Sequence, residues 1–85
     1  MAFTKIERNR VAIVGASGYG GLQLAKLISD HPNFEITYLG GERSVGKSWN
    51  NLNPFINLKN DLTIVRPIIE DIAKVSDYAI LSLPN

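Results

Sequence analysis

The sequence predicts an α/β protein with a doubly wound parallel sheet, and three observations lead to that prediction. A short β-branched segment breaks directly into a turn with glycines at positions 15, 18 and 21. A helical pattern follows the turn, and further strand-like and helix-like segments alternate along the chain. Such alternation favours a parallel sheet with right-handed crossovers. We therefore expect an incomplete sheet of about four strands in the spatial order 3-2-1-4.

The first half of the chain provides two strands and one helix, as judged by apolar periodicity. Val11–Gly15 is the first expected strand and Gly18–Asp30 the first helix. Pro32 stops that helix, because proline disfavours the α conformation in the residue before it. The alternating, β-rich segment Phe34–Leu39 is the second strand. The apolar face expected for the helix consists of Leu22, Leu24, Ala25, Leu27 and Ile28.

The second half begins with a long polar segment. Residues 42–60 lack periodicity and are expected to form a loop that packs one aromatic side chain, Trp49, onto the sheet. Residues 62–65 are the third expected strand, and residues 68–75 are a helix with Ile68, Ile69, Ile72 and Val75 on one side. Residues 78–83 are the fourth strand. The first and fourth strands are almost continuously apolar, which is typical of strands buried on both faces.

Composition excludes several classes of function. The 85 residues include nine Lys and Arg and eight Asp and Glu, interspersed to a net charge of +1, so a nucleic-acid partner is not expected. No apolar stretch approaches the roughly 20 residues that span a bilayer, and we expect no membrane partner and a cytoplasmic location. Residues 1–9 are an expected flexible lead-in to a domain at 10–85. With no cysteine and one histidine, no metal site is expected.

The glycine turn is the strongest functional signal. A strand, a glycine turn and a helix start form a corner at which backbone N–H groups and the helix dipole attract phosphate. In this Rossmann-like arrangement Gly15 supplies the tight turn, Gly18 the close approach to a pyrophosphate, and Gly21 the close packing of helix on strand. Ser17 either donates to a phosphate oxygen or caps the helix. Tyr19 either lines the cofactor crevice or lies on the surface.

The residues after the second strand select between two dinucleotides. An acidic residue there favours NAD, whereas an arginine accommodates the 2′-phosphate of NADP. Glu42 follows two glycines and lies beyond the expected ribose position. Arg43 and Ser44 offer a planar donor fork and a hydroxyl, which suit a phosphate monoester, and Lys47 adds positive potential. The sequence favours NADP, although each of these residues is also common in polar loops.

Several motifs together resemble one family. The run Val11–Gly21 followed by Leu22, the pair His31-Pro32, the pair Gly46-Lys47 and the final Leu81–Asn85 resemble the N-terminal part of N-acetyl-γ-glutamyl-phosphate reductases. Thr or Ala often follows the tyrosine in that family, so Gly20 is a departure from the pattern.

The resemblance implies NADPH-dependent reductive dephosphorylation in arginine biosynthesis, a reaction whose chemistry needs a cysteine. In that chemistry a cysteine thiolate forms a thioester from an acyl phosphate, and hydride then releases the semialdehyde. This chain has no cysteine, so we expect it to be inactive alone, and the parent enzyme to be a homo-oligomer. Only cofactor-binding positions carry over: Gly15, Ser17, Gly18, Tyr19, Gly20, Gly21, Arg43, Ser44, Leu83 and Pro84.

Two alternatives stay open. Aspartate-semialdehyde dehydrogenase has a similar corner and similar cysteine chemistry, but its usual turn lacks the combination Ser17-Gly18-Tyr19. The other alternative is a non-catalytic nucleotide-binding module. Such a module needs a final strand able to face water, whereas residues 78–83 are almost wholly apolar.

Overall fold

A computed structural model describes residues 9–16 and 18–82, which form three strands and three helices. The expected lead-in at 1–9 lies outside the described residues except for Asn9, which already belongs to the first strand. Among the described residues no helix is long and apolar enough to cross a membrane. The elements are β1 (Asn9–Val14), α1 (Tyr19–Ser29), β2 (Phe34–Gly40), α2 (Trp49–Leu52), α3 (Ile69–Val75) and β3 (Tyr78–Leu81).

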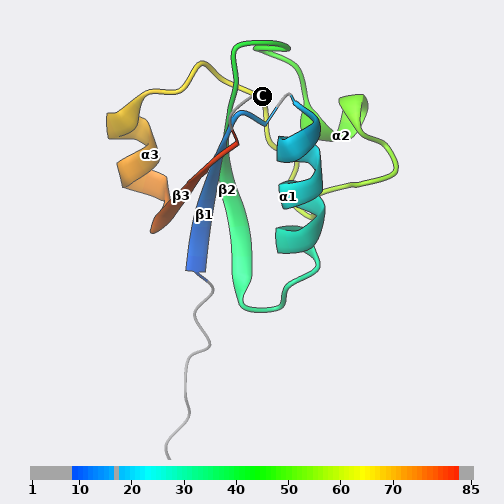
Figure 1. Ribbon diagram of the computed structural model, residues 1–85, viewed down its shortest axis with the longest axis horizontal. Helices are drawn as coiled ribbons and strands as arrows, with labels where there is room; N and C mark the ends of the chain where they lie inside the picture. Colours follow the sequence, from blue (N-terminus) through cyan, green and yellow to red (C-terminus); the bar gives the residue numbers. More distant parts are fainter. Residues whose placement is uncertain (1–8, 17, 83–85) are drawn as a thin grey trace, which may run out of the picture.

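The sheet is parallel, with the strand order β2-β1-β3. Helix α1 covers one face and α3 lies on the other, which is the expected doubly wound arrangement (Figure 1). The carboxyl ends of the strands point to the upper end of Figure 1, where the glycine turn lies. The fold class is therefore confirmed, whereas the strand count needs a correction.

The expected third strand, 62–65, does not form a regular strand in the described structure. It makes only isolated bridges, one parallel between Gly40 and Val65 and one antiparallel between Ser48 and Thr63. The contact with β2 is too short for a ladder because, of residues 62–65, only Val65 bonds to it: Val65 N–H donates to the Leu39 carbonyl. On the other side Ile64 N–H donates to the Lys47 carbonyl. The segment 62–65 still lies beside β2, so the strand expected at the outer edge of the sheet is present only as isolated bridges.

The core lies between the sheet, α1 and the segment after β2. Trp49 at the start of α2 is 1% exposed, and its ring N–H donates to the Ile56 carbonyl at 2.8 Å. The segment 42–60 thus packs its aromatic residue as expected, but it also contains a helical turn. Leu27 points away from the expected apolar face of α1 and is exposed. The core cluster comprises Ile13, Ala16, Ala25, Ile36, Leu39, Trp49, Leu58 and Ile64.

A β-bulge interrupts the pairing of β1 with β2. Val11 pairs with Ile36 but Ala12 pairs with Tyr38, so Thr37 is one residue extra in β2. The two buried residues Ile36 and Leu39 therefore join the same core cluster although they are three residues apart. Tyr38 lies outside this cluster, and its hydroxyl accepts from Ile68 N–H at 3.2 Å.

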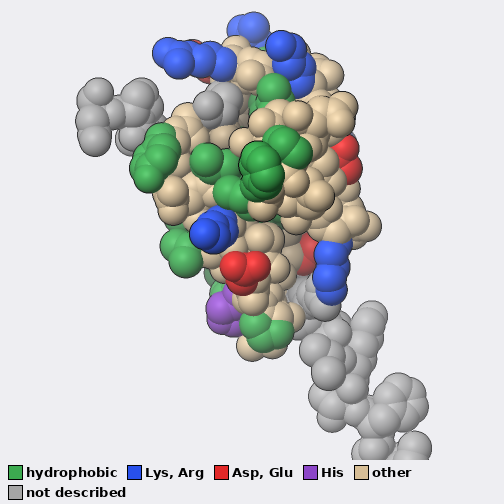
Figure 2. Space-filling view, turned by 90° about the vertical axis from the view of Figure 1, so that its right-hand side faces the viewer, with side chains coloured by type: hydrophobic (Ala, Val, Ile, Leu, Met, Phe, Trp, Pro, Cys, Tyr) green, Lys and Arg blue, Asp and Glu red, His purple; other side chains and the backbone are tan. Residues whose placement is uncertain are grey.

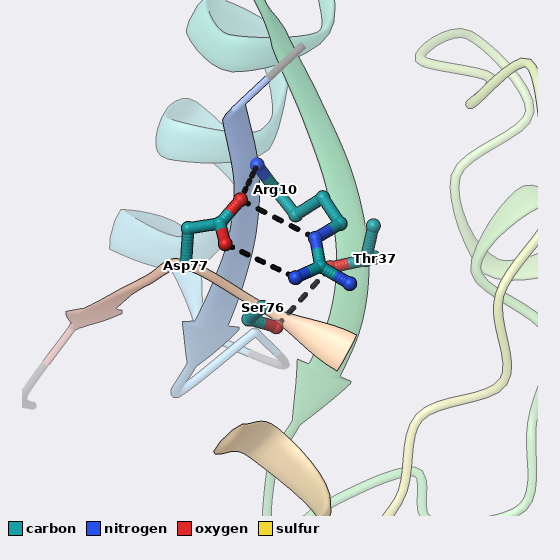
Figure 3. Close-up of polar contacts among 4 residues, drawn as sticks. All are labelled: Arg10, Thr37, Ser76 and Asp77. Carbon is teal, nitrogen blue, oxygen red and sulfur yellow. Dashed lines mark hydrogen bonds and ion pairs between the residues drawn. The ribbon is translucent and has the colours of Figure 1, made fainter. Parts of the chain in front are cut away.

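The start of β3 is held to β1 by an ion pair at the amino end of the sheet (Figure 3). The Arg10 guanidinium donates to both oxygens of Asp77, at 3.1 and 3.3 Å, and Arg10 N–H donates to the same carboxylate at 3.0 Å. These side-chain and backbone hydrogen bonds lower the pKa of Asp77 below its ordinary value. Beside them, the Thr37 and Ser76 hydroxyls are 3.1 Å apart.

The outer elements α3 and β3 are much less buried than the sequence predicts. Helix α3 begins at Ile69, with Ile68 as its N-cap, and has no buried residue. Ile69 on its expected apolar side is 81% exposed. In β3, which was expected to be buried on both faces, Tyr78 and Leu81 are exposed because β3 pairs with β1 alone among the described strands.

Candidate functional site

The glycine turn joins the carboxyl end of β1 to the start of α1. Gly15 has a φ of 95°, in the left-handed region that favours glycine. The N–H groups of Gly15 and Ala16 both donate to the Gly40 carbonyl, at 2.7 and 3.0 Å. The Gly18 N–H then donates back to the Gly15 carbonyl at 3.3 Å. The turn is thus fixed by its own backbone and by the end of β2.

The three spaced glycines differ in what a side chain would meet. A Cβ on Gly15 would overlap the Ser82 carbonyl, and one on Gly21 would overlap the Gly15 carbonyl and lie 2.7 Å from the Ala16 Cα. Among the described residues, a Cβ on Gly18 would meet only the Gly15 carbonyl, at an ordinary 3.8 Å. Gly15 and Gly21 are therefore required by the turn and its packing, as predicted. Packing does not explain the glycine at 18, and its role toward a phosphate stays a prediction.

The start of α1 faces the carboxyl end of the sheet. Its N-cap residue is Gly18, not Ser17, and no acidic side chain lies in its first turn. The first N–H groups of a helix have no acceptor within the helix and carry the positive end of its dipole. Tyr19 is 77% exposed, which agrees with a surface position. Ser17 itself lies outside the described residues.

The end of β3 lies against the turn. Ser82 N–H donates to the Val14 carbonyl at 2.7 Å, and its own carbonyl packs on Gly15. Its hydroxyl lies beside Gly20. Ser82 is not among the predicted site residues, although its hydroxyl near the end of an otherwise apolar strand could have indicated a functional residue. Leu83 and Pro84, which were expected beside the nicotinamide, lie outside the described residues.

The segment after β2 is held in a defined shape. Ser44 has a φ of 62°, a conformation that costs about 1 kcal/mol or more outside glycine. Its carbonyl accepts from Lys47 N–H at 3.1 Å, and Gly46 N–H donates to the Ile64 carbonyl at 2.8 Å. Arg43 and Lys47 are exposed. Because Gly40 pairs with Val14, this segment starts beside the glycine turn.

Basic side chains gather at the end of the molecule that carries the site. Figure 2 shows Lys and Arg side chains at the upper end of the face with α1 and α2, the end at which the strands finish in Figure 1. The Arg10–Asp77 pair lies at the opposite end of β1. An anion approaching the carboxyl ends of the strands thus meets helix N–H groups and positive charge.

Comparison with known proteins gives one consistent result. The family described as "Semialdehyde dehydrogenase, NAD binding domain" matches residues 10–85. N-acetyl-gamma-glutamyl-phosphate reductases of Prochlorococcus marinus strains NATL2A and MIT 9313 are 60% and 49% identical over 85 and 82 residues. The chain covers 24% and 23% of these relatives, so it spans about a quarter of their length.

A solved structure is similar as well. The crystal structure of aspartate semialdehyde dehydrogenase with NADP from Candida albicans is 25% identical and superposes with a TM-score of 0.74. The match covers 92% of this chain and 24% of that one. The chain belongs to the semialdehyde dehydrogenase family, whose NAD-binding domain matches it from residue 10 to residue 85.

Proposed function

We propose that this chain is the NADP-binding part of an N-acetyl-γ-glutamyl-phosphate reductase, an oxidoreductase that turns an acyl phosphate into a semialdehyde. The observation that carries the proposal is the 60% identity of all 85 residues of this chain to such a reductase. The glycine turn agrees with it, since among the described residues a Cβ at Gly18 meets only the Gly15 carbonyl at 3.8 Å. Identity to the aspartate semialdehyde dehydrogenase is only 25%, which favours the glutamyl-phosphate enzyme over that alternative.

The pyrophosphate of the cofactor would bind at the turn. The residues are Gly15, Ser17, Gly18, Tyr19, Gly20 and Gly21, of which Gly15 and Gly21 shape the backbone and Gly18 lets a phosphate approach it. The N–H groups and the positive dipole end of α1 favour the anionic charge, since no acidic residue opposes it in the first turn.

The 2′-phosphate would bind at the segment after β2. Arg43 is exposed there and offers a planar fork of donors, and the neighbouring Ser44 offers a hydroxyl. Hydrogen bonds of Gly46 and Lys47 to Ile64 keep this segment in one shape. The backbone that carries these donors is thus already ordered, which lowers the entropic cost of binding NADP.

The remaining parts of the proposal concern the chemistry of the whole enzyme. The cofactor would supply a hydride, with Leu83 and Pro84 beside its nicotinamide. This chain would bind and orient the cofactor but perform no thioester chemistry, because it contains no cysteine. We therefore expect no turnover of acyl phosphates by the 85-residue protein alone. We also propose a cytoplasmic location, a role in arginine biosynthesis and a homo-oligomeric parent enzyme.

Titration of the ¹⁵N-labelled chain with NADPH and NADH tests the proposal. Amide resonances of the turn and of the segment after β2 should shift, with weak affinity because β3 has an open edge. Gly18→Ala should lower the melting temperature slightly, because alanine is a poorer N-cap than glycine, while its Cβ meets only a 3.8 Å contact among the described residues. It should weaken both cofactors about tenfold. No shift at the turn with either cofactor would contradict the proposal.

The 2′-phosphate assignment has its own variant. Arg43→Ala should weaken NADPH by about tenfold, as expected for loss of a charge-assisted pair worth roughly 1.5 kcal/mol, and leave NADH unchanged. Lys59→Ala is the matched control, because Lys59 is also exposed but lies beside Phe34 and Glu35 at the other end of β2. Equal losses for NADPH and NADH would remove Arg43 from the 2′-phosphate site.

A further inference from the structure

Gly20 in the first turn of α1 and Ser82 directly after β3 lie against each other and form a matched pair beside the glycine turn. A Cβ built on Gly20 lies 2.5 Å from the Ser82 hydroxyl oxygen but 3.8 Å from the Ser82 Cβ. The hydroxyl alone therefore occupies the space that a side chain at position 20 would need. A side chain at position 20 would therefore require the Ser82 hydroxyl to turn to another rotamer.

The backbone of Ser82 is fixed by its contacts with Val14 and Gly15, and the residue is partly exposed. Its N–H donates to the Val14 carbonyl at 2.7 Å, and its carbonyl packs against Gly15. Within 9–16 and 18–82 the Ser82 hydroxyl forms no hydrogen bond, and no buried side-chain N or O atom in these ranges lacks a partner. The hydroxyl lies beside the first turn of α1.

We propose that Ser82 is a cofactor-contacting residue whose hydroxyl donates a hydrogen bond to a pyrophosphate oxygen of the dinucleotide, and that Gly20 is the glycine that makes room for it. This inference rests on the proposed NADP site. It adds to the glycine turn a donor from another strand, so the phosphates are held from the ends of both β1 and β3. The Ser82 hydroxyl would be a side-chain donor in addition to Ser17.

The steric part of the proposal is tested by a double-mutant cycle on the full chain. Gly20→Ala should turn the Ser82 hydroxyl to another rotamer, because the new methyl group would lie 2.5 Å from the hydroxyl oxygen, which is the free end of a short side chain. The melting temperature should stay near the wild-type value, and cofactor binding should weaken as it does in Ser82→Ala. Adding Ser82→Ala should cause no further loss of affinity, and a Gly20→Ala variant that binds as tightly as the wild type would overturn the matched pair.

The binding part is tested by titrating the same four proteins with NADPH and NADH. Ser82→Ala and the double variant should both bind about fivefold more weakly than wild type, as expected for one lost hydrogen bond. NADPH and NADH should weaken equally because both contain the pyrophosphate, in contrast to Arg43→Ala.

The outcomes separate this inference from the function on which it rests. A wild-type chain that shifts no turn resonance with either cofactor contradicts both. A wild-type chain that binds, and a Ser82→Ala variant that binds equally well, contradict only the role of Ser82. Weaker binding of NADPH with unchanged binding of NADH would move Ser82 away from the pyrophosphate.

Discussion

The regions on the two sides of β1 differ in how far they bury their apolar side chains. On one side β2, α1 and the segment around α2 contribute almost the whole core, with Leu39 and Trp49 each 1% exposed. On the other side α3 has no buried residue and β3 leaves Tyr78 and Leu81 exposed. Both regions are similarly apolar in sequence. The burial of an apolar segment therefore depends on the elements that pack against it, and its apolar composition alone does not predict it.

The largest effect that tests this difference is expected from Trp49→Ala. Truncation of a buried aromatic residue costs about 3–5 kcal/mol, and here the hydrogen bond to the Ile56 carbonyl is lost as well. That is a large share of the stability of a small domain. Ile69→Ala on α3 is the matched control and should change stability by less than about 0.5 kcal/mol, as for exposed sites.

Urea denaturation followed by circular dichroism measures both variants. If Ile69→Ala costs as much as Trp49→Ala, the two regions share one core and the comparison fails. A large effect confined to Trp49 supports it.

An intermediate effect on stability is expected at the glycine turn, where the two regions meet. Gly15→Ala places a side chain at a φ of 95° and against the Ser82 carbonyl at the end of β3. Gly46→Ala has a similar φ of 86° but meets nothing within 4 Å, so it should cost only the backbone term of about 1–2 kcal/mol. Thermal melts should place Gly15→Ala clearly below Gly46→Ala, and equal melting temperatures would show that β3 does not pack on the turn.

The smallest effect concerns the pH dependence of β3. The Arg10 hydrogen bonds hold the pKa of Asp77 below the ordinary 3.8, so the folded state binds this proton more weakly than the unfolded chain. The contribution is present above the ordinary pKa and lost as pH falls through the lowered one. Protection of the β3 amides in hydrogen exchange should therefore decrease a few-fold in acid.

The variant Asp77→Asn should show the reduced protection already at neutral pH and lack the acid dependence. Glu42→Gln, a charge loss in the segment after β2, serves as the control. An acid loss of protection that persists in Asp77→Asn would assign the effect to other groups.

The sequence predicted the fold class and the glycine turn because both depend on local patterns. Gly15 and Gly21 have the predicted backbone and packing roles, which follow from the strand, turn and helix that surround them. The reduction of 62–65 to bridges was not predictable, because it depends on how the segment 46–49 folds back: Val65 bonds to β2, whereas Leu62 and Ile64 bond to residues 46–49.

Two further features depend on long-range contacts. The bulge at Thr37 places Ile36 and Leu39 in one core cluster, whereas strict alternation places Ile36 with Tyr38. The contact of Ser82 with Gly15 and Gly20 arises only when β3 pairs with β1. A one-dimensional pattern does not encode either of them.

The shared carbonyl of Gly40 has a practical consequence for mutagenesis. Two amides, those of Gly15 and Ala16, converge on this one oxygen, and none of the three participating groups belongs to a side chain. A conventional alanine scan therefore does not remove the hydrogen bonds that join the turn to β2. Only a change in backbone chemistry, such as an amide-to-ester exchange at Ala16, removes one of its donors directly.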